Sequence, residues 1–491
     1  MISTALKTLL AASAVVSLSA CVSGVDPVAE PDVLKQFDPI DAGKAPALPM
    51  AVQVHEGDFA RIEQFTTPGG VSVWLVNEPS IPIVSFQVAW PGGSASDPEG
   101  LEGLASAMTY QMNEGAGDLP ALEFQKAMET LNMSFGCGTG RDWTSCSASM
   151  LRENAGEAMD LVALALAEPR FDEGPFERFR RQSDVSLARR ETNARFLAGE
   201  ATESALYPDH AYAREMTAES LAAITREAAL AHKDQLMVRE GMLVTAVGAI
   251  TPEDFAPLID AALKSLPETG DLTKPGPVVL ADPVAAPITV DLPQPQSLVR
   301  FTAPGLQRDN PDFFPAYVLN YTFGGGGFEA RLMEELRVKR GLTYGIGTGL
   351  TFGGEIATWR GSGQTKNESA GEFIRLIREE MTKIAADGVT EQELSDAKAY
   401  LTGAYPLGFD SNAKIAGNMM GVRQEGLGVD YFDRRNALVE AVTIEDVNRV
   451  AAEYLIPENF TFVVVGEPDG LGAAQTEIGS AEKERMDTDP E

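Results

Sequence analysis

The two halves of this chain repeat one pattern of helix and strand. Residues 224–248 align with residues 442–466 without a gap. Each segment begins with a Thr that can cap a helix, continues as an amphipathic pattern, and ends in an apolar run that stops at Gly. The identical pairs are Thr225/Thr443, Glu227/Glu445, Glu240/Glu458, Val247/Val465 and Gly248/Gly466. The matched order of elements indicates an internal duplication and predicts two similar halves, each mixing helices with strands.

Other patterns place boundaries around these halves. The predicted strands are 71–76 and 83–90, and the helical patterns cover 101–112, 154–168 and 176–205. A Pro-rich stretch, 267–295, is a predicted linker between the halves. The expected domains are therefore 51–266 and 296–468, followed by an acidic tail without a motif, 469–491.

The first twenty residues look like an export signal. Lys7 precedes a Leu/Ala/Val run that is too short for a comfortable membrane span. The run ends in Leu18-Ser19-Ala20-Cys21, which resembles a bacterial lipobox and implies cleavage before Cys21 and lipidation of its thiol. A plain signal peptide with an incidental Cys is the alternative. We expect 21–50 to form a tether, and Val22 favours the outer membrane, facing the periplasm.

Composition excludes several classes of function. A net charge of −33 repels phosphate backbones, so nucleic acid is not an expected partner. An apolar content of 44% is that of a globular chain. The histidines are only His55, His210 and His232, too few and too scattered for an imidazole-based metal site.

Two cysteines remain after the predicted lipid site. Cys137 and Cys146 flank a turn-rich stretch, 138–142, between two strand-like runs. Export would place them in an oxidising compartment. A cross-strand disulfide forms if the register sets them opposite each other. Two unpaired thiols in a hairpin are the alternative.

A series of short motifs gives the chain a family resemblance over roughly 55–468. The motifs, in chain order, are Pro91-Gly92-Gly93-Ser94, Gly103-Leu104-Ala105, Glu168-Pro169-Arg170-Phe171, Phe176-Glu177-Arg178, 207–212, 323–328, Arg331-Leu332 and 336–344. This order resembles the pitrilysin/insulinase-type zinc peptidases, the inverzincins, and in particular their mitochondrial-processing-peptidase-like branch. The resemblance implies an α+β fold of two homologous α/β sandwich halves, each a largely antiparallel sheet with helices packed on it.

The zinc motif of that family is missing. The family binds zinc through H-x-x-E-H on a helix, with the Glu as general base. The corresponding positions here are Ser106, Thr109 and Tyr110. The family's third ligand is a Glu, for which this sequence offers only Asp184 or Glu191. We therefore expect no metal or other cofactor in this chain, and zinc only in a partner subunit.

The second-half signature of the family is present. In the family an Arg and a Tyr reach across to the zinc half, hold the substrate backbone and stabilise the oxyanion. Arg337 and Tyr344 match that pair, and the alternative is a surface Arg with a packed Tyr. Phe328, Leu332, Met333 and Leu336 predict an apolar face for the helix that carries Arg337.

The glycine run Gly324, Gly325, Gly326 and Gly327 is a candidate substrate-chamber loop. No Lys-Ser or Lys-Thr follows it, so a P-loop is not expected. Glycine here would let a peptide backbone approach closely. The alternative is a flexible turn before a helix.

These observations lead to three functional hypotheses. The first is a non-catalytic subunit that supplies Arg337 and Tyr344 to an H-x-x-E-H-bearing partner acting on unfolded peptides in the cell envelope, with membrane attachment through the lipid. The second is a peptide-binding or scaffold lipoprotein of the same fold without a proteolytic role. The third is an autonomous enzyme with an unrecognised site, although no G-x-S-x-G elbow surrounds Ser106. We expect the chain to be inactive alone.

Overall fold

The computed structural model describes residues 50–57, 60–471 and 474–475, which belong to one compact unit. The predicted signal peptide, Cys21 and nearly all of the tether lie outside the described residues. None of the helices in the described part of the chain is long and apolar enough to cross a membrane.

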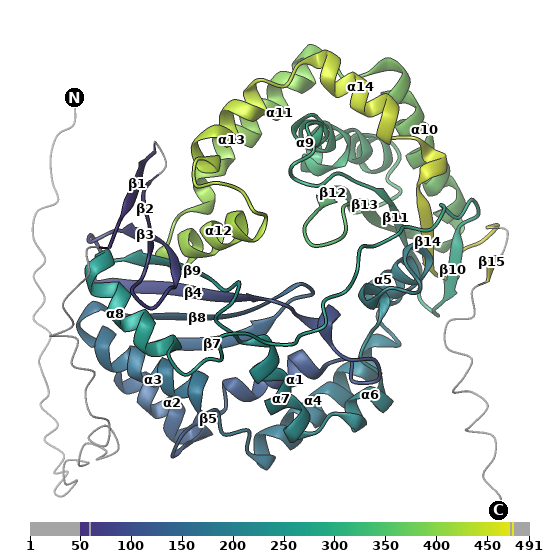
Figure 1. Cartoon of the computed structure of the whole chain (residues 1–491). Helices are drawn as coiled ribbons and strands as arrows, with labels where there is room; N and C mark the ends of the chain where they lie inside the picture. The colour runs from purple at the N-terminus through teal and green to yellow at the C-terminus, as the bar shows by residue number, and fades with distance from the viewer. Residues whose placement is uncertain (1–49, 58–59, 472–473, 476–491) are drawn as a thin grey trace, which may run out of the picture. The chain divides into compact units, whose positions relative to one another are not determined.

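The N-terminal half is a seven-stranded sheet with helices on one face (Figure 1). In spatial order its strands are β1 (Gln53–Glu56), β2 (Arg61–Thr66), β3 (Ser72–Asn77), β9 (Leu243–Gly248), β4 (Ile83–Pro91), β8 (Trp143–Leu151) and β7 (Ser134–Thr139). All neighbours are antiparallel except β3 and β9. The helices of this half are α1 (Leu104–Met112), α2 (Ala121–Thr130), α3 (Ala155–Ala167), α4 (Glu173–Arg190), α5 (Ala194–Leu206), α6 (Ala218–Ala223), α7 (Arg226–Leu236) and α8 (Pro252–Leu263). A short β5 (Gly115–Ala116) pairs with β6 (Leu119–Pro120).

The C-terminal half is a six-stranded sheet. In spatial order its strands are β12 (Ile346–Thr351), β13 (Thr358–Lys366), β11 (Gln296–Pro304), β14 (Thr461–Gly466), β10 (Ile288–Asp291) and β15 (Ala474–Gln475). Its α-helices are α9 (Phe313–Asn320), α10 (Ala370–Asp387), α11 (Glu391–Ala404), α12 (Asn412–Gln424), α13 (Tyr431–Glu440) and α14 (Ile444–Tyr454). Two π-helical segments, Tyr321–Gly325 and Met333–Lys339, follow α9.

The predicted duplication and the α+β fold of two similar halves are confirmed. The core order β3-β9-β4-β8-β7 in one sheet corresponds to β10-β14-β11-β13-β12 in the other. The repeated Thr residues cap α7 and α14, because each Thr side chain accepts a backbone N–H of the first turn. The repeated glycines end β9 and β14 at φ of 144° and 151°, where a side chain would be strained.

The predicted boundaries differ from the observed elements at two places. β10 lies inside the stretch 267–295 that the sequence predicts as a linker, and it pairs in parallel with β14. β15 lies beyond the predicted end of the second domain and pairs with β10. A four-residue strand in a Pro-rich stretch has too little periodicity to be recognised locally.

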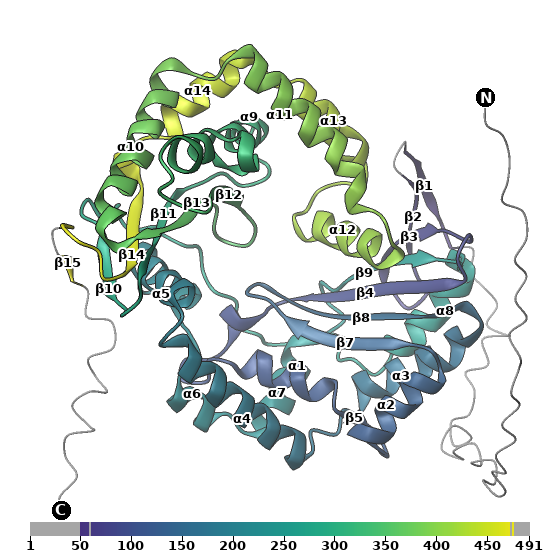
Figure 2. The same cartoon turned by 180° about the vertical axis from the view of Figure 1, so that it is seen from behind.

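Each half covers its second sheet face with a helix from the other half. α5 packs on β14 and β11, where Ala194, Ala198 and Ala201 meet apolar residues of the C-terminal sheet. α12 packs on β9 and β4, where Ala416 and Met419 meet the N-terminal sheet. Figures 1 and 2 both show α12 beside β9 and β4. The two sequence halves are therefore not independent units in space.

Arg423 at the end of α12 ties the helix to the N-terminal sheet. Its guanidinium donates to the carbonyl oxygens of Ser72 (3.1 Å) and Val244 (2.6 Å) and to Ser72 Oγ (2.8 Å). Burial lowers the pKa of Arg423 to about 10.

We predict that Arg423→Met lowers the free energy of unfolding by about 2–3 kcal/mol, because hydrogen bonds from a charged donor are lost while the apolar stem stays. Urea denaturation measures this loss. Arg434→Met is the matched control: Arg434 of α13 is exposed and paired with Asp430, the residue before the helix, and its loss should cost under about 0.5 kcal/mol. Equal losses for the two variants would contradict the assignment.

Candidate functional site

The residues that replace the zinc motif lie on α1 and serve its packing. Thr109 is buried, and its hydroxyl donates to the carbonyl oxygens of Ala105 (3.0 Å) and Ser106 (3.2 Å) in its own helix. The ring of Tyr110 packs against Phe179 of α4, with centroids 5.4 Å apart. Ser106 is half-buried. None of these side chains is a carboxylate or an imidazole, so the position does not fit a catalytic zinc ion.

The candidate third ligands do not repair the site. Asp184 on α4 and Glu191 at its C-terminal end are both exposed. Among the described residues, no group of three or more His, Cys, Asp or Glu side chains is close enough together to hold a metal ion. The histidines lie apart, with His55 bonded to Asp433 (2.5 Å), His210 bonded to the Gly276 carbonyl (2.8 Å) and His232 buried.

A buried acid–imidazole pair lies at the N-terminus of α1. The Asp97 carboxylate accepts the backbone N–H groups of Gly103 (2.8 Å) and Ala105 (2.9 Å), which the helix start leaves unpaired. His232 of α7 places Nε2 3.7 Å from the same carboxylate. Burial raises the pKa of Asp97 to about 6 and lowers the pKa of His232 to about 4. The hydrogen bonds of Asp97 anchor the helix that carries the zinc motif in the family, and His232 packs beside this carboxylate.

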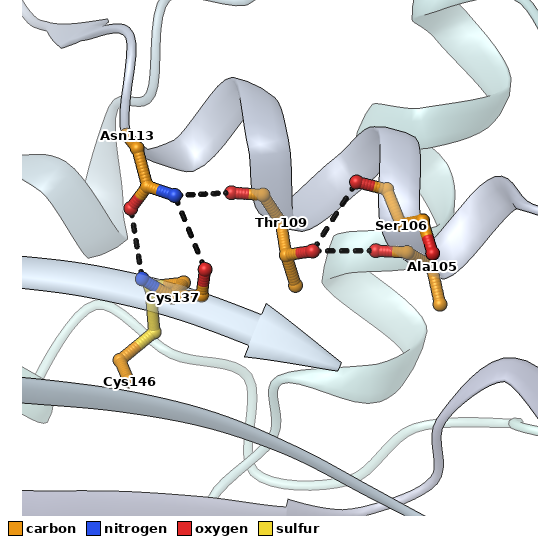
Figure 3. Close-up of a disulfide and its surroundings, with 6 residues drawn as sticks. All are labelled: Ala105, Ser106, Thr109, Asn113, Cys137 and Cys146. Carbon is orange, nitrogen blue, oxygen red and sulfur yellow. Dashed lines mark hydrogen bonds between the residues drawn. A yellow bond between two sulfur atoms is a disulfide. The ribbon is translucent and has the colours of Figure 1, made fainter. Parts of the chain in front are cut away.

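A disulfide joins Cys137 of β7 to Cys146 of β8, which the sequence left open. The two residues are direct partners in the antiparallel register, with Cα atoms 4.0 Å apart. Asn113, just after α1, bonds the backbone of Cys137 with both ends of its amide (Figure 3). The disulfide and the amide together fasten the edge of this sheet to α1.

Arg337 and Tyr344 are both available for contacts outside the chain. Arg337 lies in the π-helical segment, and its guanidinium is 4.3 Å from the ring centre of Phe328. The neighbouring cations are neutralised: Arg331 pairs with Glu393 (2.6 Å), and Lys339 and Arg340 pair with Glu335. Among the described residues, no carboxylate pairs with Arg337. Tyr344 is 86% exposed, so it is not a packed tyrosine.

The predicted apolar face before Arg337 is partly wrong. Leu332, Met333 and Leu336 are buried, but Phe328 is 63% exposed. Phe328 lies in a short 3-10 turn before the π-helical segment, so an α-helical period does not describe its direction. The helical pattern in the sequence does not predict this aromatic partner of Arg337. The glycine run ahead of it was the available signal, because it argues against a continuous helix.

The glycine run packs mainly against the chain itself. A Cβ on Gly324 would lie 2.6 Å from Thr348 Oγ1, and one on Gly326 would lie 2.8 Å from the Tyr321 carbonyl oxygen. Gly325 is similarly close to Asn320, while Gly327 has open space and a φ of 62°. Close packing around the π-helical segment therefore accounts for three of these glycines, and Gly327 remains the candidate for contact with a peptide.

Comparison with known proteins relates this geometry to a family. Two family models match, "Insulinase (Peptidase family M16)" over 72–220 and "Peptidase M16 inactive domain" over 223–401. The "Non-peptidase homolog YmxG" of Helicobacter pylori is 23% identical over 388 residues, which is 78% of this chain and 89% of that protein. An "Uncharacterized zinc protease YmxG" of Bacillus subtilis is 22% identical over 83% of this chain and 99% of its own.

Solved structures have the same fold. The peptidase M16 inactive domain from Pseudomonas fluorescens superposes with a TM-score of 0.76 and 26% identity, covering 84% of this chain and 99% of that chain. The periplasmic protease PqqL of Escherichia coli gives a TM-score of 0.73 at 16% identity over 87% of this chain and 48% of that chain. The second likeness shows the fold alone.

We predict that His232→Gln changes the pH dependence of stability. The unfolded His232 gains a proton near pH 6.5 but the folded one only near pH 4, so this residue lowers stability as pH falls through that range. Asp97 acts in the opposite direction, because its folded pKa is raised. Between pH 7 and pH 5, the free energy of unfolding of the variant should rise on the order of 1–2 kcal/mol relative to that of the wild type, as measured by urea denaturation. A pH-independent difference would contradict the buried neutral imidazole.

Removing the disulfide by the double change Cys137→Ser and Cys146→Ser should lower the free energy of unfolding by about 2–3 kcal/mol, because the unfolded chain gains entropy. Urea denaturation of the oxidised wild type and the double variant measures this. A reductant should bring the wild type to the value of the variant and leave the variant unchanged. Identical midpoints for the oxidised wild type and the variant would refute the prediction.

Proposed function

The chain belongs to the insulinase family of peptidases, family M16, without the family's zinc motif, and on this premise we propose that it is the non-catalytic subunit of a two-chain zinc peptidase. In this proposal a partner carries H-x-x-E-H and holds the zinc. This chain supplies Arg337 and Tyr344 to the partner's site. The two subunits together act on unfolded peptides in the cell envelope.

The observation that carries the proposal is that, among the described residues, no carboxylate pairs with the guanidinium of Arg337. The cations near Arg337 in the sequence pair with carboxylates, Arg331 with Glu393, and Lys339 and Arg340 with Glu335. Arg337 instead lies against the exposed ring of Phe328. A guanidinium and a phenol that keep their donors free can hold a peptide carbonyl and the negative charge that develops on it.

The residues at the zinc-motif positions of α1 support a non-catalytic role for this chain. Thr109 and Tyr110 have become packing residues, which leaves no general base at that position. The Helicobacter pylori relative carries the name of a non-peptidase homolog, in agreement with this reading. We expect the purified chain to be inactive alone.

The proposed envelope location rests on two independent features. The Leu18–Cys21 motif implies a lipid on Cys21 and attachment to the outer membrane. The Cys137–Cys146 disulfide supports export, because such bonds persist in oxidising compartments and are rare in the cytosol. A peptidase pair at this place would meet unfolded envelope proteins.

The first experiment is to identify the proteins that co-purify with the lipidated chain from its native membrane. A stoichiometric partner with H-x-x-E-H is the expected result. Capture of other envelope proteins without such a partner would favour a peptide-binding or scaffold role instead.

With the reconstituted pair, we predict that Arg337→Ala lowers kcat/KM for an unfolded peptide roughly 10²-fold, because one donor to the oxyanion is lost. Tyr344→Phe should also reduce it. Arg340→Ala is the matched control, since Arg340 lies on the same segment but pairs with Glu335, and it should leave the rate nearly unchanged. Full activity of Arg337→Ala would contradict the proposal.

A further inference from the structure

The outer edge of β7 is the feature that the proposed function does not use. β7 is the last strand of the seven-stranded sheet, and an edge strand normally offers unpaired peptide groups to another chain. In this strand the central peptide groups are already taken. The Cys137 N–H donates to Asn113 Oδ1 (2.8 Å), and Asn113 Nδ2 donates to the Cys137 carbonyl oxygen (3.1 Å) (Figure 3).

The Asn113 amide takes the place of a neighbouring strand. A residue of an adjacent antiparallel strand gives its partner one acceptor and one donor, and the carboxamide gives the same two groups to Cys137. Asn113 Nδ2 also donates to the Thr109 carbonyl oxygen (3.0 Å), which joins the amide to the last turn of α1. The amide is thus held at the edge from the helix side.

The disulfide fixes the register of β7 against β8. Cys137 lies opposite Cys146 in the register of β7 and β8. Its N–H and carbonyl groups point away from β8, as their hydrogen bonds to Asn113 show. A slip of one residue would turn these groups inward and present Gly136 or Gly138 instead. The cross-link prevents that slip, so the peptide groups that meet Asn113 stay the same.

We infer that Asn113 closes the outer edge of β7 to strand addition, so that this chain does not take an extended peptide on its own N-terminal sheet. If the proposed pair exists, the peptide strand would then be held by the partner's sheet, and that consequence alone rests on the proposed function. The closure itself concerns this chain and is tested without a partner.

The flanking residues of β7 provide internal references. Side chains and peptide groups alternate along a strand, so the peptide groups of Phe135 and Thr139 also face outward. Within the described ranges, no hydrogen bond engages those outward peptide groups. In the described part of the chain, Cys137 is therefore the one position at this edge whose outward peptide groups have a hydrogen-bond partner.

Hydrogen exchange at single amides tests the closure directly in the full chain. The Cys137 amide should exchange about tenfold or more slowly than the Phe135 and Thr139 amides, and Asn113→Ala should remove this difference. Asn154→Ala is the matched control: Asn154 also donates to a backbone carbonyl, that of Leu131, in the turn before β7 and not at the outer edge of the strand. Equal exchange at Cys137 and its two neighbours in the wild type would overturn the inference, whether or not the variant folds.

Peptide binding tests the consequence. The probe is a fluorescein-labelled heptapeptide of alternating Thr and Val, followed by fluorescence anisotropy with the mature chain alone. Asn113→Ala should bind it at least about tenfold more tightly than the wild type, whereas Asn154→Ala should match the wild type. Tight saturable binding by the wild type that is unchanged in Asn113→Ala would overturn the closure. Neither result depends on a zinc-bearing partner, so the proposed function can fail separately.

Discussion

Both sheets of this protein have an apolar patch on the face that their own helices leave uncovered, and the rest of the structure depends on how these patches are buried. α5 of the N-terminal half packs over Leu298, Val463 and Val465 of the C-terminal sheet. α12 of the C-terminal half packs over Trp74 and Val247 of the N-terminal sheet. This exchange joins the two halves directly, by packing a helix of each half on the sheet of the other. The exchanged helices pack mainly on the inner strands of the two sheets, so the edge strand β7 depends on other contacts, such as the Asn113 amide.

Local patterns in the sequence predict the repeated elements, but they do not predict that α5 and α12 pack on the sheet of the other half. The continuous charged pattern of 176–205 predicted one helix, but the structure breaks it at Asn193, which caps α5 through the N–H groups of Arg195 and Phe196. The face on which α5 packs belongs to strands about a hundred residues further along the chain or more. No window of helix or strand periodicity contains that information.

Some features of the candidate site can likewise be predicted from the sequence, and others cannot. Absence of the zinc motif and the identity of Arg337 and Tyr344 can be read from the order of residue types. The exposure of Phe328 and the two bonds of Asn113 cannot, since the first follows from a π-helical segment and the second from the register of a distant hairpin. An Asn after a helix resembles an ordinary cap until its partner strand is known.

The helix exchange has a consequence for how such a chain arose. A single ancestral half would have carried one uncovered sheet face and one helix made to cover such a face. Two copies of such a half would satisfy both needs by exchanging these helices, as in a domain-swapped dimer. Fusion of the two copies into one chain would keep this exchange, and each half could then lose what the other retains.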